Sequence, residues 1–237
     1  MLFGLRAIGS AFRQILTHIT ASLLANVMAS LLSAPVILIV GAVAYSSRSL
    51  SIIPLGVALL VGVLPNPCTA GLHSVAEEFA TVGYATFSDH WVGLRAYFVP
   101  ALKTWILSLG VTSLIVANLV FYVREIGGAS GILHSVAPGL LLAWMVVFVF
   151  WIALHLYVFP LLVVQEVKSL RLVYRNAFMM VLARPGVTAC VVPIWLVLLL
   201  VCSTTGLISF IGLTLCAGIQ HTTAARLLPT FRLQAAS

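Results

Sequence analysis

The sequence predicts an all-α polytopic membrane protein with six transmembrane helices and two cytoplasmic amphipathic helices in the membrane interface. Of the 237 residues, 62% are hydrophobic and only 7% are charged, whereas soluble domains carry about 25% charged residues. The mean hydropathy is +1.18. So few charged groups cannot cover a soluble surface, and the apolar excess must face lipid. We therefore exclude an ordinary water-soluble enzyme and expect one helical transmembrane domain over residues 1–237.

The charged residues divide the chain into long uncharged tracts, which define the spans. A helix needs about 20 apolar residues to cross a bilayer, and five tracts meet this length: 14–47, 49–76, 104–123, 126–165 and 185–225. The last tract would extend about 60 Å as one helix, so we expect it to fold back at the Ser-Thr-Thr-Gly of 203–206. The glycine-rich start of the fourth tract is typical of a loop. The predicted spans are 21–45, 50–66, 101–123, 138–164, 186–202 and 207–224.

The positions of the cations set the orientation and support the count of six. With a cytoplasmic N-terminus, six spans place ten of the twelve Lys and Arg residues inside and leave only Arg48 and Arg124 outside. One span fewer would give a split of eight to four. The arginines before the first apolar stretch resemble those of a signal peptide, but that stretch is too long, so we expect an uncleaved first span. Both termini are then cytoplasmic.

Two cytoplasmic segments, 70–85 and 166–182, show the period of an amphipathic helix. In the first, the apolar face consists of Leu72, Val75, Ala76, Phe79 and Val82. In the second, Leu170, Tyr174, Ala177, Phe178 and Val181 lie opposite Lys168, Arg171 and Arg175. The three cations predict either a connector held by lipid phosphates or a face that docks a second protein. The sequence leaves both open.

Asn26, Asn66 and His155 form the candidate intramembrane polar site. We find no Asp, Glu, Lys or Arg deep in any predicted span, which argues against a proton-driven pump. Asn26 and His155 also suit interhelical hydrogen bonds that fix packing. Asn66, in Pro-Asn-Pro, also suits the cap of a helix that begins near Ala70.

The histidines and cysteines do not predict a metal or cofactor site. Five histidines fall toward the cytoplasmic side, which raises haem or metal binding by imidazole as an option: His18, His73, His90, His155 and His221. They lie on different elements without ligand spacing, although His73 and Glu77 share one helical face. The four cysteines have no Cys-x-x-Cys spacing and are interpreted as buried free thiols. We therefore expect no metal and no cofactor.

The Gly-Ala-Ser-Gly of 128–131 is similar to the serine motif of rhomboid intramembrane proteases, with His221 as the partner of Ser130. The predicted topology places these two residues near opposite membrane surfaces, too far apart for a hydrogen bond of about 3 Å. A flexible loop is the preferred interpretation, and the chain is predicted to be non-enzymatic. The net charge of +7 is assigned to loops that face anionic lipid, and no nucleic-acid partner is expected.

The segments after the second and fourth spans carry motifs that resemble the YesL-like family of small bacterial membrane proteins. The motifs are Leu-Pro-Asn-Pro-Cys-Thr-Ala-Gly-Leu-His at 64–73, His-Leu-Tyr-Val-Phe-Pro at 155–160, Arg-Asn-Ala at 175–177 and Ala-Arg-Pro at 183–185. The resemblance covers about residues 20 to 225. Members of this family have no established activity and often accompany carbohydrate uptake systems of the ATP-binding-cassette type. The resemblance implies an accessory role.

The function expected from the sequence is that of an accessory or assembly subunit in the bacterial cytoplasmic membrane. Its expected partners are membrane lipids and another membrane protein, such as a subunit of a carbohydrate ABC-type transporter. Two alternatives remain. One is an autonomous carrier or channel for a small solute, with Asn26, Asn66 and His155 along the path. The other is an intramembrane hydrolase that uses Ser130.

Overall fold

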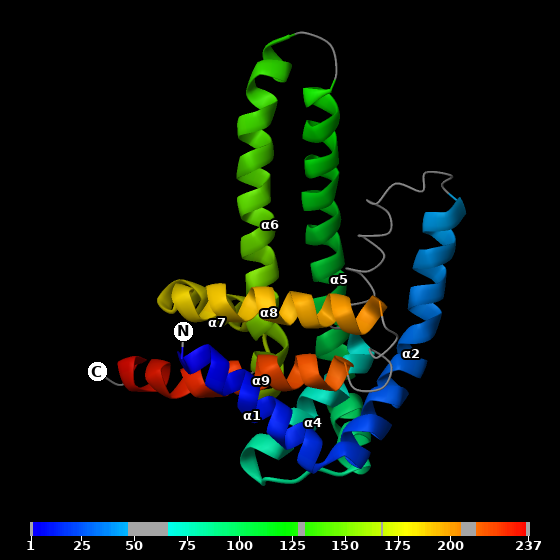
Figure 1. The fold of residues 1–237 in the computed structure, drawn as a ribbon, viewed down its shortest axis with the longest axis vertical. Helices are drawn as coiled ribbons and strands as arrows, with labels where there is room; N and C mark the ends of the chain where they lie inside the picture. The colour runs from blue at the N-terminus through cyan, green and yellow to red at the C-terminus, as the bar shows by residue number, and fades with distance from the viewer. Residues whose placement is uncertain (1, 47–65, 128–130, 167, 205–211, 236–237) are drawn as a thin grey trace.

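A computed structural model describes residues 2–46, 66–127, 131–166, 168–204 and 212–235 (Figure 1). Every regular element within these ranges is a helix, which confirms the all-helical prediction. In chain order they are α1 (Leu2–Thr17), α2 (Ile19–Ser46), the short 3-10 helix η1 (Pro67–Thr69), α4 (Ala70–Thr81), α5 (Phe87–Ile126), α6 (Ile132–Val164), α7 (Leu170–Ala183), α8 (Pro185–Thr204) and α9 (Gly212–Ala235).

Helices α5 and α6 stand side by side as a tall hairpin (Figure 1). Both are long and apolar enough to cross a membrane. Along the hairpin, large apolar side chains point outward, with Ile106 59% and Leu142 63% exposed. Such a surface needs lipid rather than water around it. The structure thus agrees with a protein embedded in a membrane.

Helix α5 begins well before the predicted start at residue 101. A capping box between Thr86 and Asp89 starts it at Phe87, and Pro100 does not end it. A proline inside a helix leaves the carbonyl four residues earlier, here that of Ala96, without its usual N–H donor, and membrane helices tolerate this. In the turn that follows, Thr104 Oγ1 donates to the Pro100 carbonyl at 2.9 Å. With 40 residues, α5 is about 60 Å long and extends beyond a hydrocarbon core of about 30 Å.

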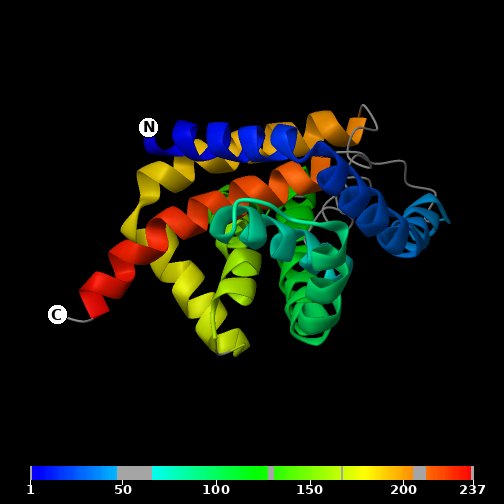
Figure 2. The same cartoon turned by 90° about the horizontal axis from the view of Figure 1, so that it is seen from below.

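A second group of helices lies across the foot of the hairpin (Figure 1). We call α1, α4 and α9, together with the foot of α6, the base layer. Figure 2 shows α9 between α1 and α4, and α9 also packs against α6 and α8. Residues 153–163 at the foot of α6 are buried on all sides and form the centre of the main core.

The structure contains fewer clear spans than the six predicted. Two helices, Phe87–Ile126 and His134–Val164, qualify by length and composition among the described residues. Two bent pairs raise the number to four if each is one span: Ile8–Thr17 with Ile19–Ser33, bent by 99°, and Leu170–Ala183 with Pro185–Leu199, bent by 105°. The predicted last span, 207–224, falls largely on α9. This helix is not among the candidate spans, because the polar residues 220–223 lie in its middle. The predicted second span, 50–66, lies outside the described residues apart from Asn66.

The two predicted amphipathic helices are present with shifted ends. Helix α4 ends at Thr81, followed by Gly83 with a positive φ of 87°, rather than at residue 85. Helix α7 covers Leu170–Ala183 rather than 166–182. The expected apolar face of α4 is buried from Leu72 to Phe79, whereas Phe178 on the predicted apolar face of α7 is 45% exposed.

Candidate functional site

The three predicted intramembrane polar residues are buried, and each makes hydrogen bonds to partners of its own. Asn26 on α2 accepts hydrogen bonds from the backbone N–H and the hydroxyl of Thr214 on α9, at 2.7 and 3.0 Å. Asn66 caps η1 by accepting from the Cys68 and Thr69 N–H groups. Its Nδ2 also donates to Ser33 Oγ at 2.9 Å. The interhelical role of Asn26 is confirmed. Asn66 caps η1, which leads directly into α4, whereas the N-cap of α4 itself is Thr69.

His155 belongs to a directional chain of hydrogen bonds that joins α5, α6 and α7. Its Nδ1 lies 2.8 Å from the Trp151 carbonyl, and its Nε2 lies 2.9 Å from Ser108 Oγ. Because a carbonyl only accepts, Nδ1 carries the proton, and Nε2 of the neutral ring accepts from Ser108. The hydroxyl of Tyr174, 2.9 Å away, then donates to Ser108. The interhelical hydrogen bond expected of His155 is therefore present.

This chain also satisfies the geometry of a serine nucleophile beside its base. However, Ser108 and His155 are each only 1% exposed, so a substrate would have to separate packed helices to reach them. The indole of Trp151 stacks on Tyr174 at 5.8 Å and donates to Thr112 Oγ1 at 2.9 Å. These contacts hold α5, α6 and α7 together, so the network has a structural role.

The predicted basic face separates into two parts. Arg171 and Arg175 on α7 are exposed. Lys168 instead donates to the carbonyls of Val163, at 2.7 Å, and Gln165, and its ammonium lies over the Tyr97 ring. It thereby satisfies carbonyl groups at the C-terminus of α6, where the helix dipole also favours a cation. Burial lowers the pKa of Lys168, while the charge of Glu77 opposes that shift.

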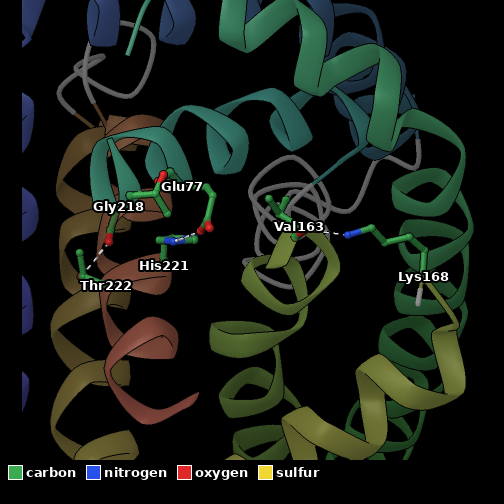
Figure 3. A network of polar contacts seen from close by, with 7 residues as sticks. Glu77, Val163, Lys168, Gly218, His221 and Thr222 are labelled. Atoms are coloured by element: carbon green, nitrogen blue, oxygen red, sulfur yellow. Dashed lines mark hydrogen bonds and ion pairs between the residues drawn. The ribbon is translucent and has the colours of Figure 1, made fainter. Parts of the chain in front are cut away.

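A polar cluster that the sequence did not predict joins α4 to α9. Figure 3 shows Glu77 and His221 facing each other, with Nε2 and Oε2 2.6 Å apart. His221 is completely buried, whereas the Glu77 side chain is 29% exposed. The hydrogen-bonding His221 imidazole holds the pKa of Glu77 below its ordinary value, although burial opposes this shift. The charge of Lys168 lowers it further.

His73 completes this cluster from the same face of α4 as Glu77. It is 1% exposed and packs against the Phe159 ring at 5.4 Å. Burial, and then the nearby His221, lower the pKa of His73 to about 3. The spacing of His73 and Glu77 was the available sequence signal, but nothing local identified His221 as their partner. Because His221 lies far from His73 and Glu77 in the sequence, the cluster could not be predicted from a local pattern.

The cluster does not form a metal centre. Among the described residues, no group of three or more His, Cys, Asp or Glu side chains could hold a metal ion. The four cysteines are free, with Cys202 and Cys216 buried and Cys68 and Cys190 half-buried. Ser130 of the protease alternative lies outside the described residues, and the proposed partner His221 contacts Glu77 instead. The contact between the Glu77 carboxylate and the His221 imidazole joins two helices.

The comparisons with known proteins give no family for this chain. No protein-family model, curated protein or solved structure matches it. The resemblance to the YesL-like family therefore stays a prediction that rests on the motifs alone.

Proposed function

We propose that this chain is a non-enzymatic accessory or assembly subunit of a larger complex in the bacterial cytoplasmic membrane, such as a carbohydrate ABC-type transporter. In this proposal it is a YesL-like protein that crosses the membrane six times, with both termini in the cytoplasm. The observation that carries the accessory role is one exposed face of α7. This face, which we call the α7 docking face, consists of Arg171, Arg175, Phe178, Met179 and Leu182.

The α7 docking face combines cations with large apolar side chains at helical spacing. Met179 is 51% and Leu182 is 55% exposed, although α7 buries its other side against the core. Within the described residues, neither Arg171 nor Arg175 has an ion-pair partner. Apolar groups that remain accessible beside unpaired arginines are typical of a protein interface, where arginine is enriched and charge guides association. This supports docking of a partner with an acidic cytoplasmic surface.

The placement of the intramembrane polar residues favours the accessory role over the autonomous carrier. A solute path needs polar side chains that turn toward a shared space. Instead, Asn26, Asn66 and His155 bond to Thr214, Ser33 and Ser108, respectively. The hydrogen bonds of all three serve the packing of helices, which supports the accessory role over the carrier.

The test is the recovery of a partner by an Arg171→Gln and Arg175→Gln double variant. Lys168 stays unchanged because it caps α6. After mild-detergent purification from the native host, the wild type should retain a stoichiometric transporter subunit, and cross-links to that subunit should map to α7. The double variant should lose it, because two unpaired charges no longer attract the partner. Identification is by mass spectrometry.

The matched control is Arg6→Gln with Arg13→Gln, which removes two exposed charges from α1. It should retain the partner at wild-type stoichiometry. Unchanged recovery with the α7 double variant would eliminate the docking face, and purification of the wild type as a lone protein would eliminate the accessory role.

A further inference from the structure

A groove runs between α6 and α8 on the side of the hairpin where α8 crosses α6. Its volume is about 610 Å³, within the range of about 300–1,000 Å³ that is usual for ligand sites. One wall is a stripe of α6 at helical spacing, which includes Leu142, Val146, Val149 and Ala153. The opposite side includes Ala189 and Val192 of α8. The groove is therefore lined by hydrocarbon over its length.

The length and position of the groove suit one leaflet of a bilayer. Its α6 wall belongs to one of the two clear membrane spans. From Leu142 to Ala153 this wall rises about 17 Å, which is close to half of a hydrocarbon core of about 30 Å. A ligand that fills the groove therefore lies alongside the lipid chains of one leaflet.

A cation lies next to residues of the groove lining. Val181 and Pro185 both line the groove, and Arg184 lies between them at the junction of α7 and α8. Arg184 is exposed, and no acidic side chain pairs with it in the described part of the chain. Thr188 is the polar side chain in the lining, but its hydroxyl is already within 2.8 Å of the Tyr157 hydroxyl. The groove thus combines an apolar lining with an exposed cation that borders it in the sequence.

We propose that this groove binds one acyl chain of an anionic phospholipid, whose phosphate group contacts Arg184. A guanidinium forms paired, charge-assisted hydrogen bonds with phosphate oxygens. A hydrocarbon chain brings no polar groups into the groove, whereas an extended peptide would leave buried N–H and C=O groups without partners. This lipid site does not depend on the proposed transporter partner, and it differs from the α7 docking face.

The test is native mass spectrometry of the purified, delipidated protein with phosphatidylglycerol and, separately, phosphatidylcholine of the same acyl chains. The wild type should retain one phosphatidylglycerol more strongly than phosphatidylcholine. The variant Arg184→Gln should weaken phosphatidylglycerol binding roughly tenfold, to the phosphatidylcholine level, because it loses one charge-assisted contact. The variant Ala189→Trp fills the groove and should lose both lipids.

Matched controls remove a charge or add a ring elsewhere. Arg13→Gln changes an exposed cation on α1, and Leu107→Trp enlarges an exposed side chain of α5 that does not line the groove. Both should bind like the wild type. Thermal unfolding in detergent reports whether each variant folds. If Ala189→Trp does not fold, Val146→Trp blocks the same groove from the α6 wall.

Four results would overturn the site. Wild-type lipid retention by both Arg184→Gln and the groove-filling variant would place the lipid elsewhere. Equal binding of the two lipids, lost only in the groove-filling variant, would eliminate recognition of the phosphate. Displacement of bound lipid by inorganic phosphate would show headgroup binding without an acyl chain in the groove. A dimer that blocks lipid binding would instead assign the groove to a second copy of the chain.

Discussion

At the scale of single residues, His73 makes the stability of the protein depend on pH. Its pKa in the folded state is about 3, compared with 6.5 when unperturbed, so the folded protein keeps it neutral while the unfolded chain takes up a proton. The contribution of His73 to the free energy of unfolding is therefore at its maximum above pH 6.5. It decreases by up to about 1.4 kcal/mol per pH unit as pH falls from 6.5 toward 3. Glu77 adds to this loss below about pH 4.5, because its folded pKa is also lowered.

The variant His73→Phe should flatten this dependence. A phenyl ring keeps an aromatic group beside Phe159 but cannot bind a proton. Between pH 7 and 4.5, the melting temperature in detergent should fall for the wild type and less steeply for His73→Phe, which lacks one of the buried histidines. His134→Phe changes an exposed histidine and should follow the wild type. Parallel curves for the wild type and His73→Phe would show that His73 titrates normally in the folded protein.

The candidate site shows which single residues could be predicted. The interhelical bond of His155 and the cap of Asn66 followed from general rules, because a buried polar group needs a partner and Asn is favoured before a helix. The sequence identified Lys168 as a cation but did not predict that its side chain turns back to cap α6. An ammonium that caps a helix has the same sequence pattern as one on a docking face. The Glu77–His221 pair depends on the packing of α4 against α9, which no local pattern encodes.

At the scale of elements, two glycines allow α4 and α5 to approach closely. A Cβ atom built on Gly93 would collide with the Ser74 side chain, and one on Gly71 would collide with the His90 backbone carbonyl. By contrast, a Cβ atom on Gly110, farther along α5, would meet nothing within 4 Å. Small residues at such positions are a usual means of close helix packing in membranes.

The variants Gly93→Ala and Gly110→Ala separate packing from helix propensity. Gly93→Ala should lower the free energy of unfolding by about 1–3 kcal/mol, because the helices must shift apart. Gly110→Ala should leave it unchanged or raise it by up to about 1 kcal/mol, because alanine favours the helix. Detergent unfolding measures both. Equal effects at the two positions would contradict the close contact.

The elements themselves were predicted more accurately than their ends. Apolar length and period located α5, α6, α4 and α7, because those signals are local. The start of α5 was missed because the third span was placed on the uncharged tract 104–123, although the Thr86–Asp89 capping box marks an earlier helix start. The role of α9 was missed because its uncharged sequence fits a span, while its buried position comes from contacts with α1, α4, α6 and α8.

At the scale of the whole molecule, contacts in the base layer restrict the number of membrane crossings. His221 pairs with Glu77, and Arg226 donates to Ser10 Oγ at 3.0 Å, so α1, α4 and α9 lie on one side of the hairpin. Lys168, which reaches the carbonyls at the foot of α6, lies on this side too. The number of crossings between α1 and α4, and between Lys168 and α9, must therefore be even. If the α5–α6 hairpin crosses the membrane, as its length and composition allow, the chain crosses two, four or six times in total.

Single cysteines in a background without the native cysteines distinguish these numbers. Position 125 is at the far end of α5, so Glu125→Cys should react with an impermeant maleimide from outside whatever the number of crossings. Arg171→Cys should react only after permeabilisation, and the reverse pattern for these two would invert the topology.

Arg48→Cys should react from outside only if α2 crosses, since the segment after it must then return. Thr204→Cys should react from outside only if α8 crosses the membrane and the chain then crosses back before α9. Six crossings require labelling at 48, 125 and 204, and labelling at 125 alone would reduce the membrane domain to the hairpin of α5 and α6.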